Sequence, residues 1–184
     1  MLEIEAKFPL PDRTPVETKL RDWGGLYTER RRDADYYFNA PDRDFATTDE
    51  SFRLRCIGEK NYLTYKGPKR DTETKTRTEL EIPIAPGEAI ATDMQQMLTF
   101  LGYRFVTIVR KSREVMHLRR GGYDLHVCFD DVDEVGSYIE LEIVADESHY
   151  ETAKAVLLQT AKELELHEQE RTSYLQLLLL KRGQ

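Results

Sequence analysis

From Leu2 to Phe8, the segment LEIEAKF alternates apolar and charged side chains at every position. Successive side chains of a β-strand point to opposite faces, so Glu3, Glu5 and Lys7 would share one face and the apolar residues the other. In most antiparallel sheets such a charged face meets water. The like charges of Glu3 and Glu5, about 7 Å apart at the rise of a strand, gain nothing there, whereas a divalent cation would stabilise them.

The same alternation recurs in later strand-like segments, from Tyr36 to about Ile84 and again over residues 104–144. Single strands tend to carry pairs of acids or pairs of bases, whereas a surface selected only for solubility would intersperse the two signs. This sorting argues against a purely solvated face. The charged face collects seven acids and seven bases: Glu3, Glu5, Glu79, Glu81, Asp130, Glu140 and Glu142, with Lys7, Arg53, Arg55, Lys66, Arg77, Lys111 and Arg113.

Helical spacing predicts amphipathic helices at residues 14–23, 86–102 and 148–164, with N-caps at Thr14 and Ser148, while the final SYLQLLLLK is a short helix or strand. Such helices pack on an apolar sheet face, so the charged face must point away from them. If about eight strands curl into a tube, the charges line its interior, which can hold one small ligand. The expected fold class is α+β, an antiparallel β-barrel or tunnel with a charged interior and helices outside, in a single domain over residues 1–184.

Composition excludes several classes of function. With 27 basic and 34 acidic residues and a net charge of −7, the chain is a poor match for nucleic acid or for a polybasic membrane anchor. Cys56 and Cys128 form no metal-spaced set, and the first strand is charged where a signal peptide would be apolar. We therefore expect a cytoplasmic protein with reduced thiols and no membrane partner.

Charges enclosed in a barrel cost several kcal/mol each unless they are paired or ligated. Carboxylates without neighbouring histidine or cysteine suit a hard cation such as Mg²⁺ or Mn²⁺. Arginine and lysine suit phosphate oxygens. A triphosphate bridged to the carboxylates through a divalent metal satisfies both sets, so the predicted partner is a small-molecule triphosphate.

Several motifs occur in order along the chain: E-x-E-x-K at Glu3–Lys7, FRLR at Phe52–Arg55, LTYKGP at Leu63–Pro68, RTELE at Arg77–Glu81, RKSR at Arg110–Arg113, FDDVDEVGSYIELE at Phe129–Glu142, and the late SYLQLLL. Together they resemble the CYTH domain family, named for class IV adenylyl cyclase and thiamine triphosphatase and grouped with the triphosphate tunnel metalloenzymes. The resemblance covers the whole chain, and it departs from the family's pattern at Asp133–Gly136, where the family has a Gly-Leu-Gly type of turn.

The resemblance implies roles for particular residues. The implied metal ligands are Glu3, Glu5, Asp130, Glu140 and Glu142. The implied phosphate-binding residues are Lys7, Arg53, Arg55, Lys66, Lys111 and Arg113, to which the position of Arg77 on the same face adds one more. The residues expected to serve catalysis most directly are Lys66, Glu5 and Glu142, and in hydrolysis the base would be either Lys66 or a metal-bound hydroxide.

Three functions fit this site. The tripeptide YYF, the APD turn and the spacing through LTYKGP are most similar to the cyclase-like branch, which implies conversion of ATP to cyclic AMP and pyrophosphate. Hydrolysis of inorganic tripolyphosphate or thiamine triphosphate is the alternative, and a non-catalytic polyphosphate or nucleotide-binding module is the third. A cyclase also needs an aromatic site for adenine, for which the candidates are Tyr36, Phe38, Tyr65 and Tyr138. Either a monomer or a homodimer is compatible with the sequence.

Overall fold

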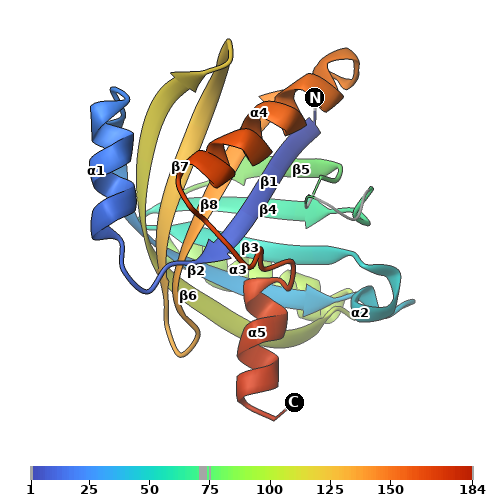
Figure 1. The fold of residues 1–184 in the computed structure, drawn as a ribbon. Coiled ribbons are helices and arrows are strands. Elements are labelled where there is room, and N and C mark those ends of the chain that lie inside the picture. Colours follow the sequence, from blue (N-terminus) through green and yellow to red (C-terminus); the bar gives the residue numbers. More distant parts are fainter. Residues whose placement is uncertain (1, 71–73, 75, 184) are drawn as a thin grey trace.

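The computed structural model describes residues 2–70, 74 and 76–183 (Figure 1). Its strands are β1 (Leu2–Pro9), β2 (Leu26–Asn39), β3 (Ser51–Ile57), β4 (Lys60–Lys66), β5 (Glu79–Ile84), β6 (Arg104–Arg120), β7 (Tyr123–Val132) and β8 (Gly136–Ala145). Its helices are α1 (Thr14–Asp22), α2 (Phe45–Thr48), α3 (Glu88–Phe100), α4 (Tyr150–Glu163) and α5 (Tyr174–Lys181), with a 3₁₀ turn at Glu147–His149.

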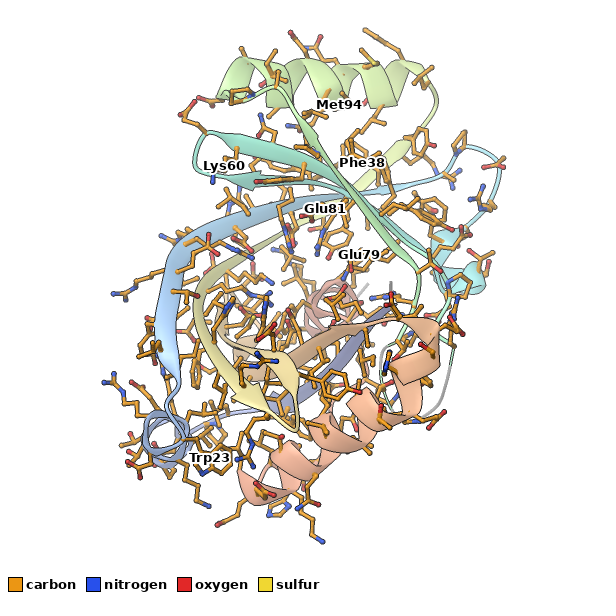
Figure 2. The ribbon with its side chains drawn as sticks, turned by 90° about the horizontal axis from the view of Figure 1, so that it is seen from above. Trp23, Phe38, Lys60, Glu79, Glu81 and Met94 are labelled. Carbon is orange, nitrogen blue, oxygen red and sulfur yellow. The ribbon has the colours of Figure 1, made fainter. Side chains whose placement is uncertain are left out.

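All eight strands belong to one antiparallel sheet, in the order β1-β8-β7-β6-β2-β3-β4-β5. The sheet curls around a common centre, and α1, α3 and α4 lie on its outside (Figure 2). Among the described residues, the two edges of the sheet are linked by one bridge, between Glu3 of β1 and Arg77 just ahead of β5. The predicted α+β fold of curled antiparallel strands is confirmed. Within the described part of the chain, this bridge is the seam at which the two edges of the sheet meet.

The apolar face of the sheet packs beneath the helices. Leu157 of α4 and Leu141 of β8 belong to one core cluster that also includes residues of α1, β1, β6 and β7. A second cluster joins Met94 of α3 to Phe38 of β2, and both side chains lie between that helix and the sheet (Figure 2). Apolar side chains therefore occupy the outer face of the sheet, as the alternation predicts, which leaves the charged face inside.

Three helices lie close to their predicted positions, with differences at their starts. Thr14 lies inside α1, and the capping position belongs to Arg13, whose side chain makes no capping bond. Ser148 lies in the 3₁₀ turn, and α4 begins two residues later, so neither predicted N-cap holds. The C-terminal segment is helical because Ser173 and Gln176 form a capping box at the start of α5. Among the described residues, no helix combines the length and the apolar character that spanning a membrane requires.

The largest difference from the expected strands is at β2. This strand begins at Leu26, ten residues before the Tyr36 at which the strand-like pattern becomes clear. Its additional residues place Arg31, Asp33 and Asp35 in the same alternating phase as Tyr37, on the inner face of the sheet. Three charged side chains that are not among the predicted inward-facing residues therefore join the interior.

Candidate active site

The curled sheet encloses a cavity of about 430 Å³, within the range of roughly 300–1,000 Å³ that is usual for small-molecule sites. Figure 2 shows Glu79 and Glu81 of β5 on the inner side of the sheet, where both line this cavity. Most lining carboxylates come from β1, β5 and β8, and most lining bases come from β2, β3, β4 and β6, with Lys69 and Arg77 contributed by the segment between β4 and β5. The charged lining consists of Glu3, Glu5, Glu79, Glu81, Glu140 and Glu142 with Arg31, Arg53, Arg55, Lys66, Lys69, Arg77, Lys111 and Arg113, together with Asp44, Asp49 and Glu50 toward one mouth.

Four glutamates on neighbouring strands form the acidic wall. Glu5 of β1 lies directly across from Glu142 of β8, with Glu3 and Glu140 at adjoining inward positions. Burial raises the pKa of Glu142, and the charges of Glu140 and Glu5 raise it further. Burial likewise raises the pKa of Glu3 well above its usual range, although the charge of Lys66 opposes the shift. These carboxylates repel one another, and a shared cation would relieve the repulsion.

The donor chemistry of this wall fits a hard divalent ion. Among the lining residues none is histidine or cysteine, so the side-chain ligands on offer are oxygens. Within the described residues, no three carboxylate, histidine or cysteine side chains already converge on one point at ligand spacing. The side chains of Glu3, Glu5, Glu140 and Glu142 would have to close around an ion.

The bases of the opposite wall are held from behind by aspartates. Asp35 accepts hydrogen bonds from Arg55 at 2.7 and 2.9 Å and from Arg53 at 3.1 Å. Burial would raise the pKa of Asp35, but the charges of Arg53 and Arg55 outweigh it and hold this pKa far below the usual range. The two guanidinium groups are therefore fixed by a carboxylate that does not itself line the cavity.

Asp130 does the same for the bases of β6. It accepts hydrogen bonds from Arg113 at 2.6 and 2.7 Å, from the Tyr174 hydroxyl at 2.9 Å and from Lys111 at 3.4 Å. Both of its oxygens are thus engaged, and Asp130 does not line the cavity. Its proposed role as a metal ligand has less support from this geometry than the roles of the four glutamates.

Carboxyl groups on the inner face thus divide by chain length. The glutamates of β1, β5 and β8 reach the cavity, whereas Asp33, Asp35 and Asp130 are buried behind the bases and do not line it. Glutamate is longer than aspartate by one methylene, which is enough to place the carboxylate in front of or behind a neighbouring arginine. The alternating pattern groups Asp130 with the glutamates, because it indicates the face of a side chain and not its reach.

Lys66 lies at the seam between the sheet edges. Its Nζ is 2.5 Å from a carboxylate oxygen of Glu79 and 3.7 Å from one of Glu3. Burial lowers the pKa of Lys66, but the charges of Glu3 and Glu79 more than compensate and raise it. Lys66 therefore remains protonated at neutral pH, a state that suits phosphate binding better than proton abstraction.

Lys7 is placed differently from the other predicted phosphate-binding residues. It is fully buried and does not line the cavity. Its Nζ donates to the carbonyl oxygen of Thr172 at 2.5 Å and lies 4.0 Å from the ring centroid of Tyr174. In addition, the backbone carbonyl of Lys7 accepts from the amide of Glu170 at 2.7 Å. Lys7 therefore ties β1 to the segment that leads into α5.

The structure brings most of the predicted site together. The predicted residues that line this cavity are Glu3, Glu5, Glu140, Glu142, Arg53, Arg55, Lys66, Arg77, Lys111 and Arg113. Lys7 and Asp130 lie beside it. Arg31, Asp33 and Asp35 were missed, although the alternation of RRRDADY could have indicated them, because Arg31, Asp33, Asp35 and Tyr37 occupy every second position.

The cavity lining also includes a set of apolar and aromatic side chains, some of them beside Asp44, Asp49 and Glu50. A shift in register between β2 and β6 leaves Val106 as an extra residue on β6, and Val106 belongs to this set. Of the four aromatic candidates, Phe38 lines the cavity, while Tyr36 packs with the α3 cluster, Tyr65 donates to Glu50 at 2.5 Å and Tyr138 packs against Tyr174. The larger apolar and aromatic side chains of the lining are Tyr37, Phe38, Phe45, Phe52, Val106, Tyr174, Leu175 and Leu179.

A curled antiparallel sheet that encloses an acidic and a basic wall in one cavity defines a class of tunnel-like barrels with a charged interior. A family model described as the CYTH domain matches residues 1–174, and the chain belongs to that family. Proteins of this family are generally enzymes that use divalent metal ions.

Comparison with individual proteins agrees with this assignment. The chain is 33% identical over 180 residues to "Putative adenylate cyclase MJ0240" of Methanocaldococcus jannaschii, covering 96% of this chain and 98% of that one. The structure of the PH1819 protein from Pyrococcus horikoshii has a TM-score of 0.84 and 32% identity, with 98% of this chain and 99% of that one covered.

A plant protein has the same fold at much lower similarity. HpAC1 from Hippeastrum, whose structure is described as revealing a dominant triphosphatase activity, has a TM-score of 0.68 and 16% identity over 99% of this chain and 95% of that one. At this identity the likeness concerns the fold alone.

Proposed function

We propose that this protein is a metal-dependent enzyme that acts on an organic triphosphate inside the charged cavity, as an adenylyl cyclase of the class IV type. The observation that carries the proposal is that four glutamates on β1 and β8 and a row of bases on β2, β3 and β6 line one cavity. The two sets meet at Arg113, which contacts Glu140 and Glu142. A triphosphate with a divalent metal is a ligand whose parts complement both walls.

Each wall has a role in this reaction. Glu3, Glu5, Glu140 and Glu142 would hold Mg²⁺ or Mn²⁺, which when bound polarises the phosphoryl group under attack. The bases would bind the phosphate oxygens and neutralise the charge that develops on departing pyrophosphate. These bases are Arg53, Arg55, Lys66, Arg77, Lys111 and Arg113. In cyclisation, the ribose 3′ oxygen forms a bond to the α-phosphorus as the bond to pyrophosphate breaks.

Two observations support a cyclase over other triphosphate chemistry. The protein of M. jannaschii, one third identical to this chain, is named for that activity. In addition, Val106, Leu175 and Leu179 are apolar side chains of the cavity lining that are not buried, and they offer surface to an organic group, which inorganic tripolyphosphate lacks.

Hydrolysis of a triphosphate is the second candidate. The same walls would hold the substrate, and water would attack the terminal phosphorus in place of the ribose oxygen. HpAC1, which has this fold, is described as having a dominant triphosphatase activity. The charged cavity serves both reactions equally, so product analysis must separate them.

The experiment is an incubation of the purified protein with Mg²⁺ or Mn²⁺ and, separately, ATP, ADP, tripolyphosphate and thiamine triphosphate. Cyclic AMP together with pyrophosphate establishes the cyclase, and orthophosphate from any of these substrates establishes a hydrolase. Ligand-induced thermal stabilisation without turnover under either metal would refute both reactions and leave a binding module. The Glu5→Gln variant serves as the inactive control.

A further inference from the structure

We propose that Arg31 is a further phosphate-binding residue of this cavity and that Asp33 positions it. The inference rests on the proposed function in requiring a phosphate-bearing ligand, and it holds for a cyclase, a hydrolase or a binding module. Arg31 lines the cavity and its side chain is 20% exposed. It belongs to an Arg-Arg-Arg run of which its neighbours Arg30 and Arg32 point outward and are 84% and 74% exposed.

Asp33 is a fully buried carboxylate among three bases from three strands. Its Oδ1 accepts a hydrogen bond from Nε of Arg31 at 3.0 Å. Its Oδ2 lies 3.9 Å from Nε of Arg55 and 4.0 Å from Nζ of Lys111, and has no hydrogen-bond partner among the described residues. Asp33 thus attracts Arg55 and Lys111 by charge without using their donors, while its one bond fixes the guanidinium of Arg31.

Arg31 also retains a donor for a ligand. Asp33 engages its Nε and Glu29 its Nη1, and within the described part of the chain Nη2 makes no hydrogen bond. A guanidinium that is held at two of its nitrogens and keeps the third for a ligand is suited to a phosphate oxygen, because its orientation is set before the ligand arrives.

The register of the sheet gives an independent argument. Arg31 of β2 and Arg113 of β6 are direct cross-strand partners on the inner face. Like charges placed opposite each other on neighbouring strands are destabilising. Carboxylates behind and beside them compensate part of this repulsion, and an anion that accepts from both arginines would remove more of it. The basic wall therefore extends along β2 to Arg31, two inward positions beyond the level of Arg55.

The test compares two neighbouring arginines on opposite faces of one strand. Arg31→Gln and the matched control Arg30→Gln each remove one guanidinium, and the affinity for inorganic tripolyphosphate is measured by calorimetry on chelator-treated protein. Loss of one charged hydrogen bond predicts a dissociation constant about tenfold higher or more for Arg31→Gln and less than about twofold higher for Arg30→Gln. Equal affinities in the two variants would overturn the role of Arg31.

Asp33→Asn tests the positioning role through the sign of its effect. Removing a negative charge from the basic wall should by itself strengthen binding of a polyanion. If Asp33 positions the bases, tripolyphosphate instead binds more weakly, and the effects of Asp33→Asn and Arg31→Gln are not additive in a double-mutant cycle. Stronger binding, or additive effects, would show that Asp33 only balances charge.

Failure of this inference can be told apart from failure of the proposed function. Wild-type protein that binds tripolyphosphate but turns over no substrate refutes the enzyme and leaves the assignment of Arg31 and Asp33 to be judged by the variants. Wild-type protein that turns over a substrate, with Arg31→Gln and Arg30→Gln binding tripolyphosphate equally well, refutes the assignment of Arg31 and leaves the enzyme. If Asp33→Asn does not fold, as judged by circular dichroism, Arg31→Gln against Arg30→Gln still decides whether Arg31 binds phosphate.

Discussion

Glu5 and Glu142 lie directly opposite each other on β1 and β8, and both line the cavity. A like-charged pair in this position costs stability, and burial raises the pKa of Glu142 further against its ionised form. Arg31 and Arg113 form the corresponding pair of bases on β2 and β6. The interior thus contains one repulsive pair that a cation would relieve and another that an anion would relieve.

Replacing Glu5 by glutamine should impair metal binding without harming the fold. The substitution keeps the shape of the side chain and removes one of two opposed charges, so we expect the affinity for Mn²⁺ and the catalytic activity to fall more than about 100-fold. Calorimetric titration with Mn²⁺ measures the first effect and turnover the second. Asp124→Asn, at a side chain 77% exposed on β7, is the matched control, and retained turnover by Glu5→Gln would exclude Glu5 as a ligand.

Stability of the metal-free protein should fall as the pH rises. The pKa of Glu142 is raised above 4.5 in the folded protein, so the folded state holds this proton more tightly than the unfolded chain does. The favourable contribution is complete below the unfolded value and is lost as the pH rises through the folded value. Melting temperatures of chelator-treated protein between about pH 5 and pH 8 should therefore fall more steeply in wild type than in Glu142→Gln.

Saturating Mn²⁺ supplies the converse measurement. The ion favours the ionised carboxylates, so it should raise the melting temperature most at high pH and least near pH 5. Parallel melting profiles for wild type and Glu142→Gln, with and without Mn²⁺, would contradict the linkage of Glu142 to both protons and metal.

Replacing Asp35 by asparagine should destabilise the protein severely. Asp35 is buried between Arg53 and Arg55, and its removal as a charge leaves two guanidinium groups without their shared partner. Breaking a buried ion pair costs about 3–5 kcal/mol. Urea unfolding of Asp35→Asn measures this loss, and Asp42→Asn, at a side chain 67% exposed, should change stability by less than about 0.5 kcal/mol.

The Tyr174→Phe variant tests whether the Tyr174 hydroxyl has a structural or a catalytic role. The Tyr174 hydroxyl donates to Asp130 behind the basic wall, and burial raises the pKa of this phenol well above its usual range. We expect the variant to lose about 1 kcal/mol of stability and to keep its activity within a few-fold. A loss of turnover with unchanged stability and unchanged substrate affinity would instead make the hydroxyl a catalytic group.

Much of the fold follows from the sequence because apolar residues of the outer face alternate with charged residues of the inner face in the same strands. Where a helix covers the outer face, as over Ile4 and Leu141, the period-two pattern of apolar residues marks the strand and its register. The first part of β2 lacks this signal. Arg30 and Arg32 face water on its outer side while Arg31 and Asp33 face the interior, so both faces are polar and no apolar period marks the strand.

Other parts of the site depend on contacts between residues far apart in the sequence. The bond between Lys7 and Thr172 joins residues 165 positions apart, and no local pattern around Lys7 distinguishes a lysine that holds a C-terminal helix from one that holds phosphate. The start of α4 is a local case, in which a 3₁₀ turn precedes the helix and Ser148 loses the capping position.

On the inner face, aspartates lie behind the bases and glutamates reach the cavity, and this difference changes which substitutions are mild in this protein. Exchanging one acidic residue for the other preserves charge and is usually regarded as harmless. Here, Asp130→Glu would extend the carboxylate past Arg113 toward the cavity, and Glu142→Asp would withdraw a carboxylate from the proposed metal site. Sequence variants that keep every acidic position acidic can therefore still differ in whether they hold an ion.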